Sequence, residues 1–282
     1  MVNIGQYNQL QVVKKVDFGC YLDGGSFGNI LLPKKYVDKD TKPGDTIDVF
    51  IYLDSEDRIV ATTLKPKVRV GECAYLKVVQ TNRVGAFLDW GLPKDLLVPF
   101  NEQQKPMQQG HSCTVYVYLD RQSERIAASS WLENHLASDG KIFKPKQAVE
   151  LMIYARSDLG FKAIVDGTHL GQLYENEVFR KLHYGEKLAG YINNIRDDGR
   201  IDLSLYQAAH LSRIGLGDQI LAYLEANDGV SSLTDKSPPQ DIYDTFGISK
   251  SVYKKTLGLL YKNRQIKIEK DRVTLTVGTI KN

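Results

Sequence analysis

The chain has 282 residues, of which 42% are hydrophobic and 25% charged, and its formal net charge is +3. This is the composition of an ordinary folded protein, long enough for two to four small domains. There is no apolar run of membrane-span length and no signal-peptide pattern at the N-terminus, so a cytoplasmic protein is expected. The cysteines and histidines are scattered, which predicts neither disulfides nor a metal site.

Two stretches of the first half have nearly the same sequence. VFIYLDSEDRIVATT (49–63) returns 66 residues later as VYVYLDRQSERIAAS (115–129), with one additional residue in the polar turn, where a hairpin tolerates it. A third, more diverged copy lies about 75 residues further on and ends in GYINNIRDDGRIDLS (190–204). Its Asp-Gly pair is a strong signal for the tip of a hairpin. The chain therefore contains three related units.

Each unit is predicted to consist mostly of short strands. In the first unit, strands are expected in LQVVKKVDFGCYLD (10–23) with a break near Gly19, in GNILLP (28–33), and in the hairpin formed by 45–54 and 58–63. Apolar and polar residues alternate in the hairpin, which indicates half-buried strands. Five strands in about 65 residues favour a small closed barrel, because closure removes the sheet edges.

The residues after the third unit follow a different pattern. Helices are predicted over 218–226, from 238 to 246, and after Ser249, which is placed to act as an N-cap. The segment QIKIEKDRVTLTV (265–277) predicts a hairpin around a charged turn. Three helices followed by this hairpin are the order of a winged helix-turn-helix. The basic surplus of the chain also lies here, with 11 Lys and Arg against 8 Asp and Glu over 211–282.

The third of these helices separates apolar from basic residues. At 100° per residue, its inner arc is expected to contain Val252, Tyr253, Thr256, Leu257, Leu259 and Leu260. The basic and outward positions are Lys250, Lys254, Gly258, Tyr261 and Lys262, and the hairpin adds Lys267, Lys270 and Arg272. This charge predicts contact with phosphates. A solvated lysine face on a docking domain is the alternative.

Several motifs in the repeats resemble a known RNA-binding barrel. The first unit contains Phe-Gly-x-Tyr-Leu-Asp, Gly-x-Ile-Leu-Leu-Pro and Asp-x-x-x-Arg-Ile, and the third unit ends in Arg-Ile-x-Leu-Ser. These resemble the S-one domain, named after the largest protein of the small ribosomal subunit, which implies an oligonucleotide-binding (OB) fold. The expected fold class is therefore mainly β. We expect three tandem five-stranded OB barrels over 1–66, 67–140 and 141–210, followed by an α+β winged helix-turn-helix domain over 211–282.

This domain order resembles the bacterial conserved virulence factor B family, also called YitL-like proteins, over essentially the whole chain. FIYLDSEDRIVATT (50–63) and VGAFLDWGLPKDLLVP (84–99) are the most telling stretches. The resemblance implies an RNA-binding role in post-transcriptional regulation, including virulence regulation. There is no Walker loop, GxSxG or HExxH motif, so no catalytic residue is assigned and a non-enzyme is expected.

The S-one family also implies which residues contact RNA. In that family, the bases of bound RNA stack on residues of the second strand and on residues near the end of the third strand. The second-strand positions correspond to Phe18 and Tyr21, Val84 and Phe87, and Leu159 and Lys162, with Phe161 between the last two. The third-strand position is assigned to Leu31, Leu97 and Tyr174. An arginine follows the last turn in each unit, as Arg58, Arg125 and Arg200.

We expect the third unit and the winged helix to contribute most of the binding, because the third unit keeps an aromatic third-strand residue and precedes the basic domain. The expected contacts are Phe161, Tyr174, Arg196, Arg200, Lys250, Lys254, Lys262, Lys267, Lys270 and Arg272. The first two units lack the histidine that is frequent in the family, and their secondary candidates are Phe18, Tyr21, Arg58, Phe87 and Arg125. Core packing is the alternative for the rings, and pairing with nearby acids is the alternative for the arginines.

The expected partner is single-stranded RNA, bound by a monomer without metal ion, cofactor or membrane. Two other functions are compatible with the same sequence. A DNA-binding transcription regulator would use the winged helix, with the barrels sensing or dimerising. A protein adaptor would use the barrels to bind components of the translation or RNA-decay machinery.

Overall fold

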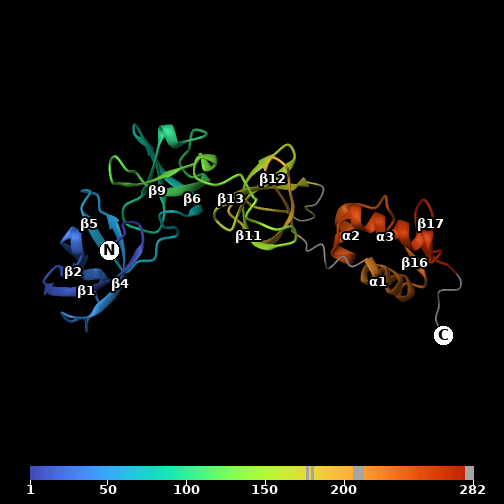
Figure 1. The fold of residues 1–282 in the computed structure, drawn as a ribbon, viewed down its shortest axis with the longest axis horizontal. Helices are drawn as coiled ribbons and strands as arrows, with labels where there is room; N and C mark the ends of the chain where they lie inside the picture. Colours follow the sequence, from blue (N-terminus) through green and yellow to red (C-terminus); the bar gives the residue numbers. More distant parts are fainter. Residues whose placement is uncertain (176–177, 179–180, 206–212, 277–282) are drawn as a thin grey trace. The chain divides into compact units, whose positions relative to one another are not determined.

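The structure is a computed structural model that describes residues 1–175, 178, 181–205 and 213–276 (Figure 1). Within these ranges it contains three closed five-stranded barrels and a C-terminal winged helix domain, which confirms the mainly β fold. The chain divides into two compact units, 1–136 and 137–282. The first unit holds barrels one and two, and the second holds barrel three and the winged helix domain.

The three barrels have the same connectivity. Barrel one has the strand order β1-β2-β3-β5-β4, and its strands are β1 (Tyr7–Val16), β2 (Gly19–Asp23), β3 (Asn29–Pro33), β4 (Thr46–Leu53) and β5 (Ile59–Thr62). Barrel two consists of β6 (Cys73–Asn82), β7 (Gly85–Asp89), β8 (Leu96–Pro99), β9 (Ser112–Leu119) and β10 (Ile126–Ser129). Barrel three consists of β11 (Ala148–Ser157), β12 (Gly160–Val165), β13 (His169–Tyr174), β14 (Lys187–Ile195) and β15 (Ile201–Ser204). In each barrel the third and fifth strands pair in parallel and close the sheet.

A glycine begins the second strand of every barrel. Gly19 has φ 156°, and a Cβ atom there would lie 2.1 Å from the carbonyl oxygen of Leu32. The second and third strands approach this closely only without a side chain at that position. The repeated glycines at Gly85 and Gly160 meet Val98 and Leu173 in the same way.

Barrel one has a core of its own, and a second hydrophobic cluster, which we call the shared core, joins the outer side of barrel one to barrel two. Strand β4 is buried on both sides: Val49 and Ile51 pack inside barrel one, whereas Phe50 and Tyr52 belong to a buried cluster with residues of barrel two. The Phe50 ring centroid lies 5.9 Å from that of Trp90, with the planes at 77°. The alternation predicted for this strand is therefore present, but its outer side is covered by the neighbouring barrel.

The C-terminal domain is a small helical bundle closed by a sheet. Its elements are α1 (Arg213–Ala226), β16 (Val230–Ser231), α2 (Pro239–Phe246), α3 (Lys250–Lys262), β17 (Ile266–Ile268) and β18 (Val273–Leu275). The predicted hairpin is confirmed, and β16 extends it to a sheet of order β16-β18-β17. The first helix begins at Arg213, earlier than predicted. None of the helices in the described ranges is long and apolar enough to cross a membrane.

Helix α3 lies largely as predicted from its periodicity. Ser249 caps it by accepting a hydrogen bond from the backbone N–H of Val252, at 3.2 Å. Tyr253 and Leu257 are buried in the domain core, and the Tyr253 hydroxyl donates to the Leu233 carbonyl at 3.0 Å. Leu259 was expected on the inner arc, but 39% of it is exposed, so that assignment is wrong.

Candidate nucleic-acid interface

Strand pairing establishes which positions of the three barrels are equivalent. Across the second and third strands, the equivalent pairs are Tyr21–Leu31, Phe87–Leu97 and Lys162–Gln172. Tyr174 instead pairs with Gly160, so it corresponds to Pro33 and Pro99 of the other barrels. The predicted third-strand assignment of Tyr174 is therefore wrong by two residues, and Gln172 occupies that position.

Phe161 lies in the core of barrel three. It is only 8% exposed and belongs to the buried cluster of this barrel, and the Arg156 guanidinium lies 5.2 Å from its ring centroid. Phe161 follows Gly160 as Cys20 follows Gly19, and side chains alternate along a strand, so this position faces inward. The ring is not available as a stacking platform, which corrects its assignment as a contact.

Tyr174 and Arg196 are brought together around a carboxylate. Asp202 accepts from the Tyr174 hydroxyl at 3.2 Å and from Arg196 Nε at 2.9 Å. The Arg196 guanidinium lies 5.7 Å from the Tyr174 ring centroid. Asp202 neutralises the charge of Arg196, which weakens the case for phosphate binding on this side of barrel three.

The arginines after the last turn of each barrel all have acidic partners. The pairs are Arg58 with Asp54 at 2.7 Å and with Glu56 at 2.8 Å, Arg125 with Asp57 at 2.5 Å, and Arg200 with Asp198 at 3.4 Å. Burial alone would raise the pKa of Asp54, but hydrogen bonds from Arg58 lower it below its ordinary value. The acidic stretch around Asp54 forms a turn, with Asp57 at φ 60°. Arg58 and Arg200 therefore pair with acids of their own turns, as the sequence-based alternative expected, whereas Arg125 pairs with an acid of barrel one.

Barrel one presents an aromatic surface with nearby lysines. Phe18 is 56% exposed, and its ring centroid lies 6.2 Å from that of Tyr21 with the planes at 87°. Lys14 is opposite Tyr21 on the neighbouring strand, and its Nζ lies 4.9 Å from the ring centroid. The backbone N–H of Lys34 donates to the Phe18 carbonyl at 2.9 Å, so the main chain of a second exposed lysine lies beside that of Phe18. We call Phe18, Tyr21, Lys14 and Lys34 the first-barrel face.

Two residues of this face were missed by the sequence analysis. Lys14 lies on the first strand, and Lys34 follows the third strand, at neither of the positions that the family resemblance emphasises. Residues 14 and 21 flank the turn between the first two strands, so hairpin pairing was the signal that could have placed Lys14 opposite Tyr21.

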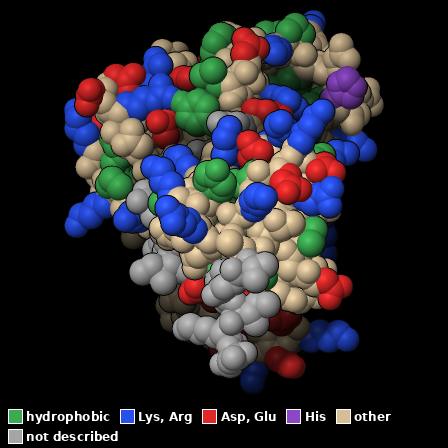
Figure 2. Space-filling model, turned by 90° about the vertical axis from the view of Figure 1, so that its right-hand side faces the viewer, with side chains coloured by type: hydrophobic (Ala, Val, Ile, Leu, Met, Phe, Trp, Pro, Cys, Tyr) green, Lys and Arg blue, Asp and Glu red, His purple; other side chains and the backbone are tan. Residues whose placement is uncertain are grey.

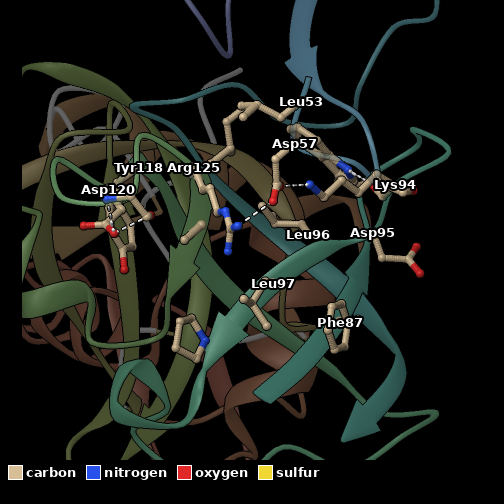
Figure 3. A pocket seen from close by; sticks show the side chains of 16 residues that line it. Leu53, Asp57, Phe87, Lys94, Asp95, Leu96, Leu97, Tyr118, Asp120 and Arg125 are labelled. Carbon is tan, nitrogen blue, oxygen red and sulfur yellow. Dashed lines mark hydrogen bonds and ion pairs between the residues drawn. The ribbon is translucent and has the colours of Figure 1, made fainter. Parts of the chain in front are cut away.

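The corresponding part of barrel two is a pocket of about 320 Å³. Phe87 and Leu97 line it from barrel two, and Asp57 reaches it from the β4–β5 turn of barrel one (Figure 3). Lys94 Nζ lies 2.8 Å from Asp57, and Arg125 approaches the other carboxylate oxygen. These contacts bring the secondary candidates Phe87 and Arg125 into one site.

Most of the predicted lysines of the winged helix domain lie on its surface. Lys254, Lys262, Lys267 and Lys270 are exposed, whereas Lys250 is half-buried. Arg272 pairs with Glu269 and Asp271, and Lys254 has Asp235 at 3.9 Å. In Figure 2, Lys and Arg side chains are spread over the visible face with Asp and Glu between them.

The third helix also exposes residues that were not predicted to contact nucleic acid. Lys255 is exposed between Lys254 and the buried Thr256. Leu259 and Tyr261 add exposed apolar surface to the same helix. The outer side of α3 therefore offers cations together with a ring, a combination suited to polynucleotides.

Comparison with known proteins agrees with this architecture. The family model for the S1 domain matches residues 4–64 and 70–129, and the model for the CvfB-like winged helix domain matches 218–275. Conserved virulence factor B of Staphylococcus aureus (strain MRSA252) is 28% identical, over 97% of this chain and 94% of the relative. The chain contains S1 domains and a CvfB-like winged helix domain, and it is similar to conserved virulence factor B over nearly its whole length. A second relative, the uncharacterized protein YitL of Bacillus subtilis (strain 168), is 27% identical over 93% of this chain and 90% of the relative.

One solved structure is also similar in sequence to this chain. It is a multidomain protein with nucleic acid binding domains from Streptococcus pneumoniae TIGR4, 25% identical, with 97% of this chain and 98% of that chain covered and a TM-score of 0.42. The S1 and winged helix models themselves describe nucleic-acid-binding domains rather than enzyme families. The domains of the chain therefore support nucleic-acid binding.

Proposed function

We propose that the protein binds single-stranded RNA in the bacterial cytoplasm and acts in post-transcriptional regulation by binding, without catalysis. The observation that supports this best is the first-barrel face. It combines an exposed ring, a second ring edge-on to it, and a lysine ammonium 4.9 Å from that ring. Stacked bases and the phosphates between them are recognised by this combination of groups.

Single strands fit this face better than duplexes. Bases in a duplex are stacked on each other, so their faces cannot reach Phe18 or Tyr21 without unpairing. Each base stacked on an aromatic side chain contributes about 1–3 kcal/mol, which is about a 5- to 150-fold change in affinity. Lysine contacts to phosphates add a term that falls with salt concentration.

This proposal places the main stacking site in barrel one, not in barrel three as the sequence suggested. The buried ring of Phe161 and the pairing of Arg196 with Asp202 remove two of the expected contributors in barrel three. The winged helix keeps its proposed role in phosphate contact, through the exposed lysines of α3 and of the β17–β18 hairpin. Tyr174 and Arg200 remain candidates at the edge of barrel three.

The test is a titration of the full-length protein against a labelled single-stranded RNA and a duplex DNA of the same length, each at two salt concentrations. Wild-type protein is expected to prefer the RNA, and Tyr21→Ala is expected to weaken RNA binding at least about fivefold. Tyr75→Ala removes an exposed ring from β6 and is the control, expected to bind as wild type does.

Other outcomes identify the alternatives. A preference for duplex DNA would favour a transcription regulator led by the winged helix. A protein that binds neither nucleic acid at low salt would refute the proposal, and partners retained after nuclease treatment would then favour an adaptor. Unchanged binding by Tyr21→Ala together with loss in Tyr174→Ala would return the main site to barrel three.

A further inference from the structure

The face of barrel two that corresponds to the first-barrel face is partly covered by barrel one. Phe87 takes the register position of Tyr21, and Leu97 takes that of Leu31. Both line the 320 Å³ pocket, and the β4–β5 turn of barrel one contributes Asp57 to the same pocket (Figure 3). The face of barrel two is therefore partly covered by a turn of barrel one, whereas the equivalent face of barrel one is open to solvent.

The carboxylate of Asp57 lies between the two cations of this pocket. Lys94 Nζ donates to one of its oxygens at 2.8 Å and to the backbone carbonyl of Asp54 at 2.7 Å. Arg125 donates to the other oxygen. Lysine and arginine on either side of two oxygens are also how proteins hold a phosphate group. A nucleic-acid phosphate on this face would need the donors that Asp57 already uses.

The turn that carries Asp57 is held in place from both sides. The Asp57 N–H donates to the Asp54 carbonyl at 3.0 Å, and the Asp54 carboxylate accepts from the backbone N–H of Arg58, also at 3.0 Å. Phe50, on the strand before the turn, is packed against Trp90 in the shared core. Because the carboxylate is positioned in advance, it competes for Lys94 and Arg125 as an intramolecular ligand of high effective concentration.

We propose that Asp57 of barrel one occupies a phosphate position on barrel two and keeps that face from binding RNA. This inference rests on the proposed function, since it treats the outer faces of the barrels as RNA-binding surfaces. The ligand of the covered face is a nucleotide unit, with its base on Phe87 and its phosphate between Lys94 and Arg125. A strand reaches this site only by displacing the Asp57 carboxylate.

The decisive variant is Asp57→Asn, which removes the charge with little change in shape. Asparagine tolerates the left-handed backbone found here, so the turn keeps its conformation. Full-length variants are titrated with a single-stranded oligouridine at several salt concentrations. The variant is expected to bind more tightly, and the plot of log affinity against log salt is expected to steepen by about 0.7 for each additional phosphate that the protein binds.

The matched control is Glu56→Gln, in the same turn. Glu56 pairs with Arg58 and not with the pocket cations, so its replacement removes the same charge without freeing Lys94 or Arg125. Phe87→Ala tests whether the additional binding uses barrel two. Combined with Asp57→Asn, it is expected to abolish the increase in affinity, and alone it is expected to change RNA binding little. If a thermal melt shows that Asp57→Asn is not folded, Asp57→Gly replaces it, because glycine accepts the same φ.

The outcomes separate this inference from the proposed function. If wild type binds RNA through Tyr21 but Asp57→Asn binds no more tightly than Glu56→Gln, the inference is overturned and the proposed function stands. If only Asp57→Asn binds, the inference is supported and the face on barrel two is the main RNA site. If neither wild type nor Asp57→Asn binds at low salt, both are overturned.

Discussion

Replacing Phe50 by alanine should destabilise the unit formed by barrels one and two. Phe50 is fully buried, and it packs outside its own barrel, against Trp90 and Tyr7. Removing a buried phenylalanine side chain costs about 3–5 kcal/mol, because apolar contacts are lost and a cavity remains. At about 4 °C per kcal/mol for a unit of this size, the melting temperature should fall by about 15 °C.

Tryptophan fluorescence is the assay that isolates this effect. The chain has two tryptophans, Trp90 and Trp131, and both lie in the unit formed by barrels one and two. Phe27→Ala removes an exposed ring of barrel one and should shift the melt by less than about 3 °C. If Phe50→Ala melts like Phe27→Ala, the shared core contributes little and the coupling deduced from it is wrong.

Three further results are expected. Ser249→Ala removes the N-cap of α3 and should lower the free energy of unfolding of the winged helix domain by about 1 kcal/mol, followed by helical circular dichroism in urea. The pKa of Asp57 is lowered, chiefly by its hydrogen bond from Lys94. Its stabilising contribution is therefore present above the unfolded-state pKa of about 4 and is lost as pH falls below that value, so the stability difference between wild type and Asp57→Asn should vanish in acid melts. Lys255→Ala should reduce the salt dependence of RNA binding by about 0.7 in slope if this lysine contacts a phosphate, and an unchanged slope would exclude that contact.

Much of the fold could be predicted because its signals are local. The repeated Tyr-Leu-Asp hairpins show the first two units, and the glycine at the start of each second strand aligns all three copies. Capping at Ser249 and the period of α3 identified the third helix and most of its buried side. Leu259 was misplaced because it lies at the edge of the apolar arc, where the periodicity does not decide between core and solvent.

The candidate site was harder to predict than the fold. Phe161 could have been recognised as buried, since it follows Gly160 as the buried Cys20 follows Gly19. Tyr174 was misplaced because the diverged third copy was matched by residue type instead of by the offset between strands. The contact of Asp57 with Lys94 had no local signal at all: it joins residues 37 positions apart in different barrels, and depends on how the barrels pack.

The segment between the first two barrels is anchored to barrel two. Val68 is buried in the shared core, and the Lys67 N–H donates to the Trp90 carbonyl at 2.8 Å. A strand of RNA bound to barrel one would therefore find barrel two at a spacing set by packing, without the range of distances that a loose tether samples. When the RNA also contacts barrel two, no chain entropy is lost, because there is no flexible linker to restrain. For the same reason, the barrels cannot move apart to accommodate a strand of the wrong length or curvature. Such a pair of barrels would select nucleic acids by the distance and curvature between two contacts, as well as bind them.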